Sequence, residues 1–237
     1  MFKKHEWLVL ATYALMLGIT LLITLILVKM YNFDPFHTTI YTNMVVFLIG
    51  AAIIYMLLNR DLKDERKAHP LRTYDLTIWV ISGVFLTFGG QMVANVIEIE
   101  LLGIKPGSEN THLIVELTKM NPIFLLLPAI IGPIVEELVF RKVLFGGLRR
   151  KMNIHVAAVI SSLIFAVFHA ELEHLLVYFV IGLIFVFLYV KTNRIIVPML
   201  VHMSMNTIAV LVQRSIDPEE LERMLDELSF IFLGGWF

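Results

Sequence analysis

The chain has 237 residues, of which 58% are hydrophobic and 16% charged, and its mean hydropathy is +0.81. This composition excludes an ordinary soluble domain and predicts a protein that crosses a membrane several times. The net charge of −1 gives no electrostatic case for binding nucleic acid. The absence of cysteine excludes disulfides, a thiolate nucleophile and thiolate metal ligands.

Apolar windows of about 20 residues, the length that crosses roughly 30 Å of hydrocarbon, recur along the chain. They predict seven transmembrane helices at 7–28, 39–58, 76–96, 122–146, 154–170, 175–190 and 195–212. The first is too long for a signal-peptide core and no cleavage-site pattern follows it, so we expect it to be retained. The acidic, amphipathic stretch 217–228 and the short apolar end of the chain predict an interfacial segment or an eighth helix.

The positions of Lys and Arg predict the orientation of these helices. Of the 19 such residues, 12 lie in the N-terminal segment and in alternate loops, 5 lie on the opposite side, and Arg141 and Lys142 lie within a helix. Because basic residues gather on the cytoplasmic side, we expect the N-terminus to be cytoplasmic. No repeat, low-complexity tract or flexible linker divides the chain, so residues 1–237 are predicted to form a single membrane domain.

A few polar side chains lie inside the apolar windows, where a charged group costs about 3 kcal/mol or more. They are Glu136, Glu137 and Arg141 in the fourth window, His169 at the end of the fifth, and His202 with Asn206 in the seventh. Proline precedes two of these sets, at positions 133 and 198, and we expect it to kink each helix and make room for a polar intramembrane cavity.

Helical spacing separates the two adjacent glutamates. Glu137 and Arg141 are four residues apart, so they share a helix face and are expected to pair, whereas Glu136 points about 100° away. Glu137 is therefore interpreted as structural and Glu136 as the residue free to act. Phe165 with His169, and His202 with Asn206, also have the i, i+4 spacing that places each pair on one face.

The segments "EELVFR" (136–141), "FAVFH" (165–169) and "HMSMN" (202–206) occur in this order, each on an apolar helix. The chain resembles the CAAX protease and bacteriocin-processing family of intramembrane proteases, also called the Abi family, whose motifs are E-E-x-x-x-R, F-x-x-x-H and H-x-x-x-N. The resemblance covers about residues 122–212, which would be the catalytic core. It implies an all-α polytopic bundle that hydrolyses a peptide bond in a membrane-associated or lipidated substrate.

The resemblance also implies roles for these residues. Glu136 would be the general base that activates water, assisted by His169, and His202 with Asn206 would stabilise the oxyanion. Glu137, Arg141 and Phe165 would support the site. The family has been called metalloproteases, and Glu136, His169 and His202 have the side-chain types that bind zinc. The amide of Asn206 suits an oxyanion better than zinc, so we expect that no cofactor is required.

Other protease designs agree less well with the sequence. Ser161 and Ser162 lie about two turns from His169 on its own helix, aspartates are absent from the helix interiors, and no H-E-x-x-H motif occurs. The side chains of Glu171, Glu173 and His174 resemble a metal site but lie in a short loop, so we expect them to be solvated.

Two other functions remain open at this point. One is a proton-coupled transporter, although the chain lacks the repeated halves typical of that class. The other is a non-catalytic membrane protein that binds a peptide, as in immunity. The expected partners are a membrane-associated peptide or protein and the lipid bilayer, and the expected location is a bacterial plasma membrane.

Overall fold

The computed structural model describes residues 2–105 and 109–215, and these ranges are helical without a strand. The helices are α1 (Lys4–Tyr31), α2 (Pro35–Ala68), α3 (Thr73–Leu102), α4 (Glu109–Met120), a composite helix (Pro122–Leu148), α7 (Ile154–Phe168), α8 (Leu175–Thr192) and α9 (Ile196–Ser215). Each of the seven predicted windows falls on a helix, which confirms the all-α class. The stretch 217–228 and the end of the chain lie outside the described residues.

Five of the described helices are long and apolar enough to cross a membrane: α1, α2, α3, the composite helix and α8. The helix α7 and the apolar part of α9, Ile196–Val212, are shorter. The sequence did not predict α4, a 12-residue helix whose polar side chains interrupt its apolar ones.

The connections between helices are short because the residues at the helix ends favour sharp turns. Asp34 accepts a hydrogen bond from the His37 backbone N–H, 2.8 Å away, and Pro35 follows as the first residue of α2. Gly103 and Asn193 end α3 and α8 in the left-handed conformation, with φ of 67° and 51°.

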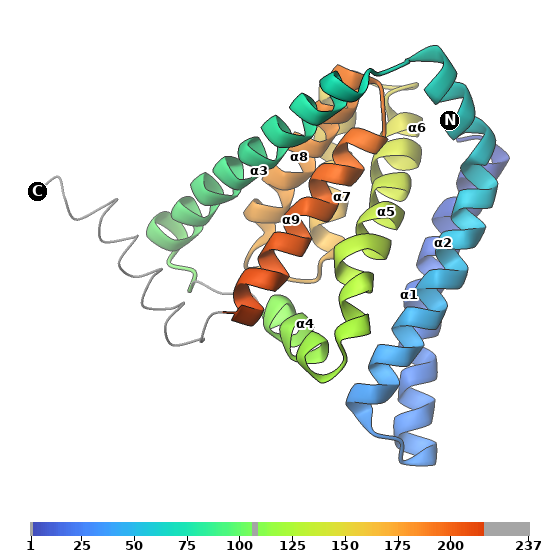
Figure 1. Ribbon diagram of the computed structural model, residues 1–237, viewed down its shortest axis with the longest axis vertical. Helices are drawn as coiled ribbons and strands as arrows, with labels where there is room; N and C mark the ends of the chain where they lie inside the picture. Colours follow the sequence, from blue (N-terminus) through green and yellow to red (C-terminus); the bar gives the residue numbers. More distant parts are fainter. Residues whose placement is uncertain (1, 106–108, 216–237) are drawn as a thin grey trace, which may run out of the picture.

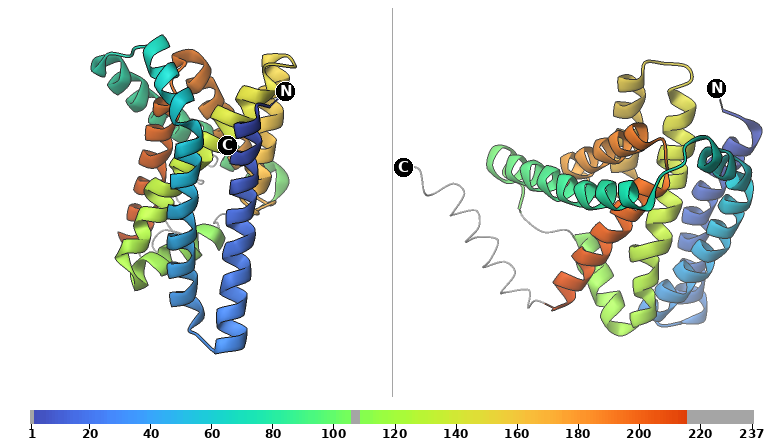
Figure 2. Two further views of the ribbon diagram at one scale, coloured as in Figure 1. Left: turned by 90° about the vertical axis from the view of Figure 1, so that its right-hand side faces the viewer. Right: turned by 45° about the horizontal axis from the view of Figure 1, so that its top comes forward.

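The composite helix lies at the centre of the bundle. On one side it contacts the antiparallel pair α1 and α2, and on the other it contacts α7 and α9 (Figure 1). The helix α3 packs across α8 and α9, and Figure 2 shows how far it diverges from the α1–α2 pair. Inside the described region, 56% of the apolar window of the composite helix is buried, against 17–33% for the other four long helices. The polar residues of the composite helix are therefore held inside protein.

Candidate active site

The composite helix changes its winding where the polar residues occur. It begins as a 3-10 turn, η1 (Pro122–Leu125), continues as π-helix in η2 (Leu127–Ile131), and becomes α-helix in α5 (Gly132–Glu136). A second π-helical stretch, η3 (Glu137–Phe145), leads into α6 (Gly146–Leu148). Proline is the second residue of both η2 and α5, where its missing N–H disturbs regular α-helical bonding. π-Helical turns are frequent at functional sites.

Glu136 and Glu137 sit at the junction of α5 and η3, and both face His202 of α9. The Nδ1 atom of His202 lies 3.0 Å from Oε1 of Glu137 and donates a hydrogen bond to that carboxylate. The Nε2 atom of the same ring lies 3.7 Å from Oε2 of Glu136, beyond hydrogen-bond distance. The Glu136 side chain is 21% exposed and that of Glu137 is fully buried. Glu136 is thus the accessible carboxylate of the two.

Arg141 forms the expected ion pair with Glu137, with Nη1 3.2 Å from Oε1. Its guanidinium also lies 3.9 Å from the ring centre of Phe165 and 5.0 Å from that of Phe185. Such cation–π contacts contribute about 2 kcal/mol when the cation is desolvated. Phe185 belongs to α8 and also packs against His202, with ring centres 4.9 Å apart. Phe185 could not be singled out from the sequence, because it lies in a uniformly apolar stretch.

His169 follows the last residue of α7. Its Nδ1 atom lies 2.9 Å from the carbonyl oxygen of Phe165, so Nδ1 carries the proton and donates. In the neutral ring, Nε2 is then the acceptor, and it forms no hydrogen bond with the residues that the structure describes. His169 lies within electrostatic range of Glu136 and His202. The structure therefore brings His169 to the same part of the bundle as Glu136 and His202.

Asn206 lies one turn beyond His202 on α9. Its Nδ2 donates a hydrogen bond to the carbonyl oxygen of Pro128, 2.9 Å away, which ties α9 to η2. An amide nitrogen has two hydrogens, so one N–H of Asn206 remains to bond a substrate oxygen.

The loop between α7 and α8 differs from expectation, because two of its three polar side chains are held by protein rather than solvated. Nδ1 of His174 lies 2.9 Å from Oε2 of Glu98, a carboxylate of α3 that is only 1% exposed. The hydroxyl of Tyr178 donates to Oε2 of Glu171 at 2.6 Å. Glu173 is exposed as expected. Sequence periodicity cannot predict these partners, since each comes from a different helix.

The three side chains considered as zinc ligands, Glu136, His169 and His202, do not form a compact ligand set. Among the described residues, the one group of three such side chains whose ligand atoms all lie within 4.8 Å of one another is His5, Glu6 and Asp61. Zinc held at about 2.1 Å by three ligands requires those atoms to be closer than this. Oε2 of Glu136 and Nε2 of His202 lie 3.7 Å apart, so it is His169 that does not come within 4.8 Å of both.

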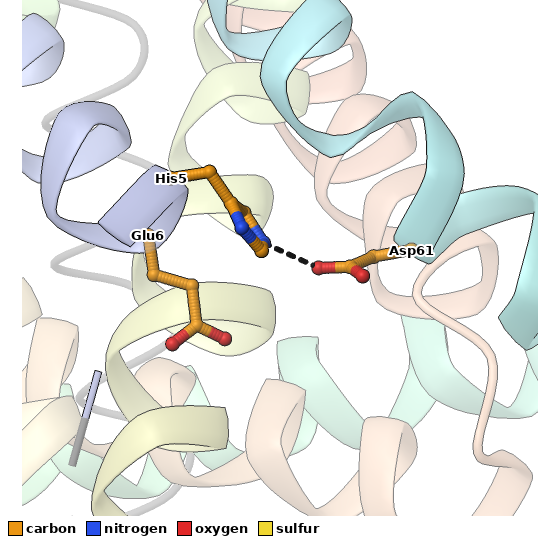
Figure 3. A group of neighbouring side chains, drawn as sticks. All are labelled: His5, Glu6 and Asp61. Carbon is orange, nitrogen blue, oxygen red and sulfur yellow. Dashed lines mark hydrogen bonds and ion pairs between the residues drawn. The ribbon is translucent and has the colours of Figure 1, made fainter. Parts of the chain in front are cut away.

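Figure 3 shows His5 and Asp61 pointing toward one another, joined by a hydrogen bond of 2.8 Å, with Glu6 beside them. Both carboxylates already have cationic partners. Arg150 pairs with Glu6, and the Lys3 ammonium lies 3.6 Å from Asp61. This local balance of charge makes the group an ion-pair network that holds the start of α1 to α2 and to the end of the composite helix.

Comparison with known proteins gives consistent matches. A model of the Rce1-like type II CAAX prenyl endopeptidases matches residues 118–208, the region that holds every motif residue. The candidate membrane peptidase YdiL of Bacillus subtilis is 32% identical over 244 residues, which cover 99% of each chain. The membrane-embedded CAAX protease MroQ of Staphylococcus aureus is 35% identical over 203 residues, or 81% of each chain. No solved structure matches significantly.

Proposed function

Because this chain belongs to the CAAX protease and bacteriocin-processing family of membrane proteases, we propose that it cleaves a peptide bond of a membrane-associated substrate with water activated by Glu136. The chain is a CAAX-type peptide hydrolase and a multi-pass membrane protein.

The observation that carries the mechanism is the unequal environment of the two glutamates around His202. Oε1 of Glu137 pairs with Nη1 of Arg141 at 3.2 Å and accepts a hydrogen bond from Nδ1 of His202 at 3.0 Å. Glu136 is partly exposed and keeps its carboxylate 3.7 Å from Nε2. A general base must reach water and must keep an oxygen free to take a proton. Glu136 meets both conditions, because it is partly exposed and is not hydrogen-bonded to His202.

In this mechanism Glu136 takes a proton as the water oxygen attacks the peptide carbonyl carbon. The negative charge moves to the carbonyl oxygen, where the free N–H of Asn206 and the Nε2–H of protonated His202 donate hydrogen bonds. Glu137 accepts from the other N–H of that imidazolium. Each oxyanion donor of this kind contributes about 3 to 4 kcal/mol to transition-state stabilisation.

His169 assists in the transfer of the proton. Its Nδ1 is hydrogen-bonded to the Phe165 carbonyl oxygen, so Nε2 is the nitrogen that can accept a proton. When the tetrahedral intermediate collapses, the carbon–nitrogen bond breaks and the proton held by Glu136 and His169 passes to the leaving amine. The products are a carboxylate and an amine, with one water consumed. No step of this mechanism requires a metal.

The proposed substrate is a peptide or protein held at the membrane, in a lipidated form or as a short hydrophobic peptide. Glu136 lies on a helix that is apolar enough to span the bilayer, so a substrate must enter from the lipid or from its surface. The matching family description names prenyl endopeptidases, and one relative is named a CAAX protease. Bacteriocin processing is a second substrate class that belongs to the same proposal.

The experiment that tests the function uses the full chain, purified in detergent and mixed with synthetic peptides that carry a C-terminal prenyl group or a hydrophobic segment. Mass spectrometry of the products is expected to show one new carboxyl terminus and the matching amine. Peptide that is bound but never cleaved would instead support a non-catalytic binding protein.

We propose further that the N-terminus is cytoplasmic. The segments predicted to be cytoplasmic meet at one end of the bundle, where Glu65 of α2 accepts from the backbone N–H of Ile195 at 2.8 Å and pairs with Lys142. Arg194 reaches the carbonyl oxygen of His69 at 2.9 Å. A reporter fused after Arg150 is expected on the cytoplasmic side, and one inserted at residue 108 outside. The reverse pattern would invert the topology.

A further inference from the structure

Tyr178 of α8 lies directly against His169, although no motif includes it. The two rings are stacked, with centres 4.1 Å apart and planes 26° apart. The Nδ1 atom of the same imidazole donates a hydrogen bond to the carbonyl oxygen of Phe165, 2.9 Å away. One neighbour therefore fixes the plane of the ring and the other fixes its rotation within that plane.

Both the hydroxyl and the backbone of Tyr178 are held in place by neighbouring residues. Its hydroxyl donates to Oε2 of Glu171, 2.6 Å away, in the loop that follows His169. Its backbone is the fourth residue of α8, and the start of that helix is fixed by Glu98. One Glu98 oxygen accepts from His174 at 2.9 Å, and the other accepts from the backbone N–H of Val177 at 3.2 Å.

The carboxylate of Glu98 is favourable at the start of α8 for two reasons. The first N–H groups of a helix have no partner within the helix, and the helix dipole attracts negative charge there. The Glu98 side chain is 1% exposed, so the contact anchors α3 to the start of α8 without water access. A chain of contacts thus runs from α3 through the start of α8 to the His169 ring.

The loop needs such an anchor because its backbone is strained. Ala170, the residue after His169, has φ of 59°, a left-handed conformation that costs about 1 kcal/mol or more for a residue with a side chain. A strained residue persists only where its surroundings hold it. The stacked tyrosine and the Glu171 hydrogen bond hold this loop on either side of Ala170.

We propose that Tyr178 is a positioning residue for His169, which keeps the Nε2 acceptor of that ring aimed at the reacting groups. The inference rests on the proposed function, since it assumes that His169 takes part in proton transfer. Tyr178 touches neither substrate nor water in this role. It acts by restricting the imidazole to one orientation and one tautomer.

The test compares Tyr178→Leu, which removes the stacked ring, with Tyr178→Phe, which keeps the ring and removes the hydroxyl. For Tyr178→Leu we expect kcat to fall about 10- to 100-fold, the loss typical of residues that orient metal-bound histidines, with KM nearly unchanged. Tyr178→Phe is expected to retain most of kcat. Phe179→Leu is the matched control, because Phe179 is next in the chain and lines an apolar groove with Leu163 and Leu176.

A second readout does not depend on cleavage. Nitrogen-15 spectra of labelled histidine, with the His169→Ala spectrum subtracted, report which ring nitrogen of His169 carries the proton. The wild type and Tyr178→Phe are expected to show Nδ1–H, and Tyr178→Leu a mixture of both tautomers. Thermal unfolding in detergent confirms that each variant is folded.

The outcomes separate this inference from the function on which it rests. Full activity in His169→Ala would overturn the role of His169 itself. Loss of activity in His169→Ala, together with normal kcat and an unchanged tautomer in Tyr178→Leu, would overturn only the positioning role. Equal losses in Tyr178→Leu and Phe179→Leu would mean that α8 packing, and not the stacked ring, is responsible, and would also overturn it.

Discussion

Glu136→Gln is expected to lower the cleavage rate by about 10²- to 10⁴-fold, the usual contribution of a general base. Glutamine has nearly the same shape as glutamate and keeps an oxygen acceptor, but it cannot take a proton from water at neutral pH. Because Glu136 is 21% exposed and its carboxylate lies 3.7 Å from Nε2 of His202, beyond hydrogen-bond distance, the variant is expected to fold normally. The measurement is the initial rate of peptide cleavage by variants purified in the same detergent.

Glu100→Gln provides the matched control for this experiment. Glu100 is an exposed glutamate near the end of α3, so its replacement removes the same charge from a position outside the candidate site. It is expected to leave the rate unchanged. If Glu136→Gln kept more than about a tenth of the wild-type rate, the assignment of the general base would be wrong.

Arg141→Met and Glu137→Gln are expected to cause the largest losses of stability in the described part of the chain. Both side chains are buried, and each single change leaves the other charge without its 3.2 Å partner. Removing one member of a buried ion pair typically costs about 3 to 5 kcal/mol. Denaturant unfolding of each variant in mixed detergent measures the loss.

The double variant, with both changes, distinguishes an ion pair from two independent packing sites. Two neutral side chains leave no unpaired charge, so its stability is expected to exceed that of the less stable single variant. Its cleavage rate is nevertheless expected to stay low, because His202 has lost the carboxylate that accepts from Nδ1. Additive losses of stability would show that Glu137 and Arg141 are not coupled.

Those residues also show what the sequence could and could not predict. The four-residue spacing of Glu137 and Arg141 predicted their pairing, and the apolar windows predicted the positions of the long helices. The shared contact of both glutamates with His202 was missed. It depends on a partner 65 residues away and on π-helical winding from Glu137 onward, whereas the prediction assumed regular α-helix.

Glu98 was missed because the predicted third helix ended at residue 96, whereas α3 continues to Leu102. Tyr178 was missed for a different reason. In a membrane protein, side chains that face lipid and side chains that face the core are both apolar, so the sequence does not reveal which face of a helix packs inward. Phe85 on α3 is 74% exposed, for example, whereas Phe185 on α8 is fully buried. An aromatic residue that supports a catalytic histidine therefore has no distinctive pattern, and only the packing of α7 against α8 identifies it.

In the proposed mechanism Glu136 activates water with no metal taking part in the chemical step. The decisive measurement is of cleavage and bound metal on the same purified sample, before and after chelation. The stripped protein is expected to cleave peptide at the rate of the untreated protein. One equivalent of zinc in the wild type, absent from both His169→Ala and His202→Ala and able to restore activity to stripped wild-type protein, would contradict it.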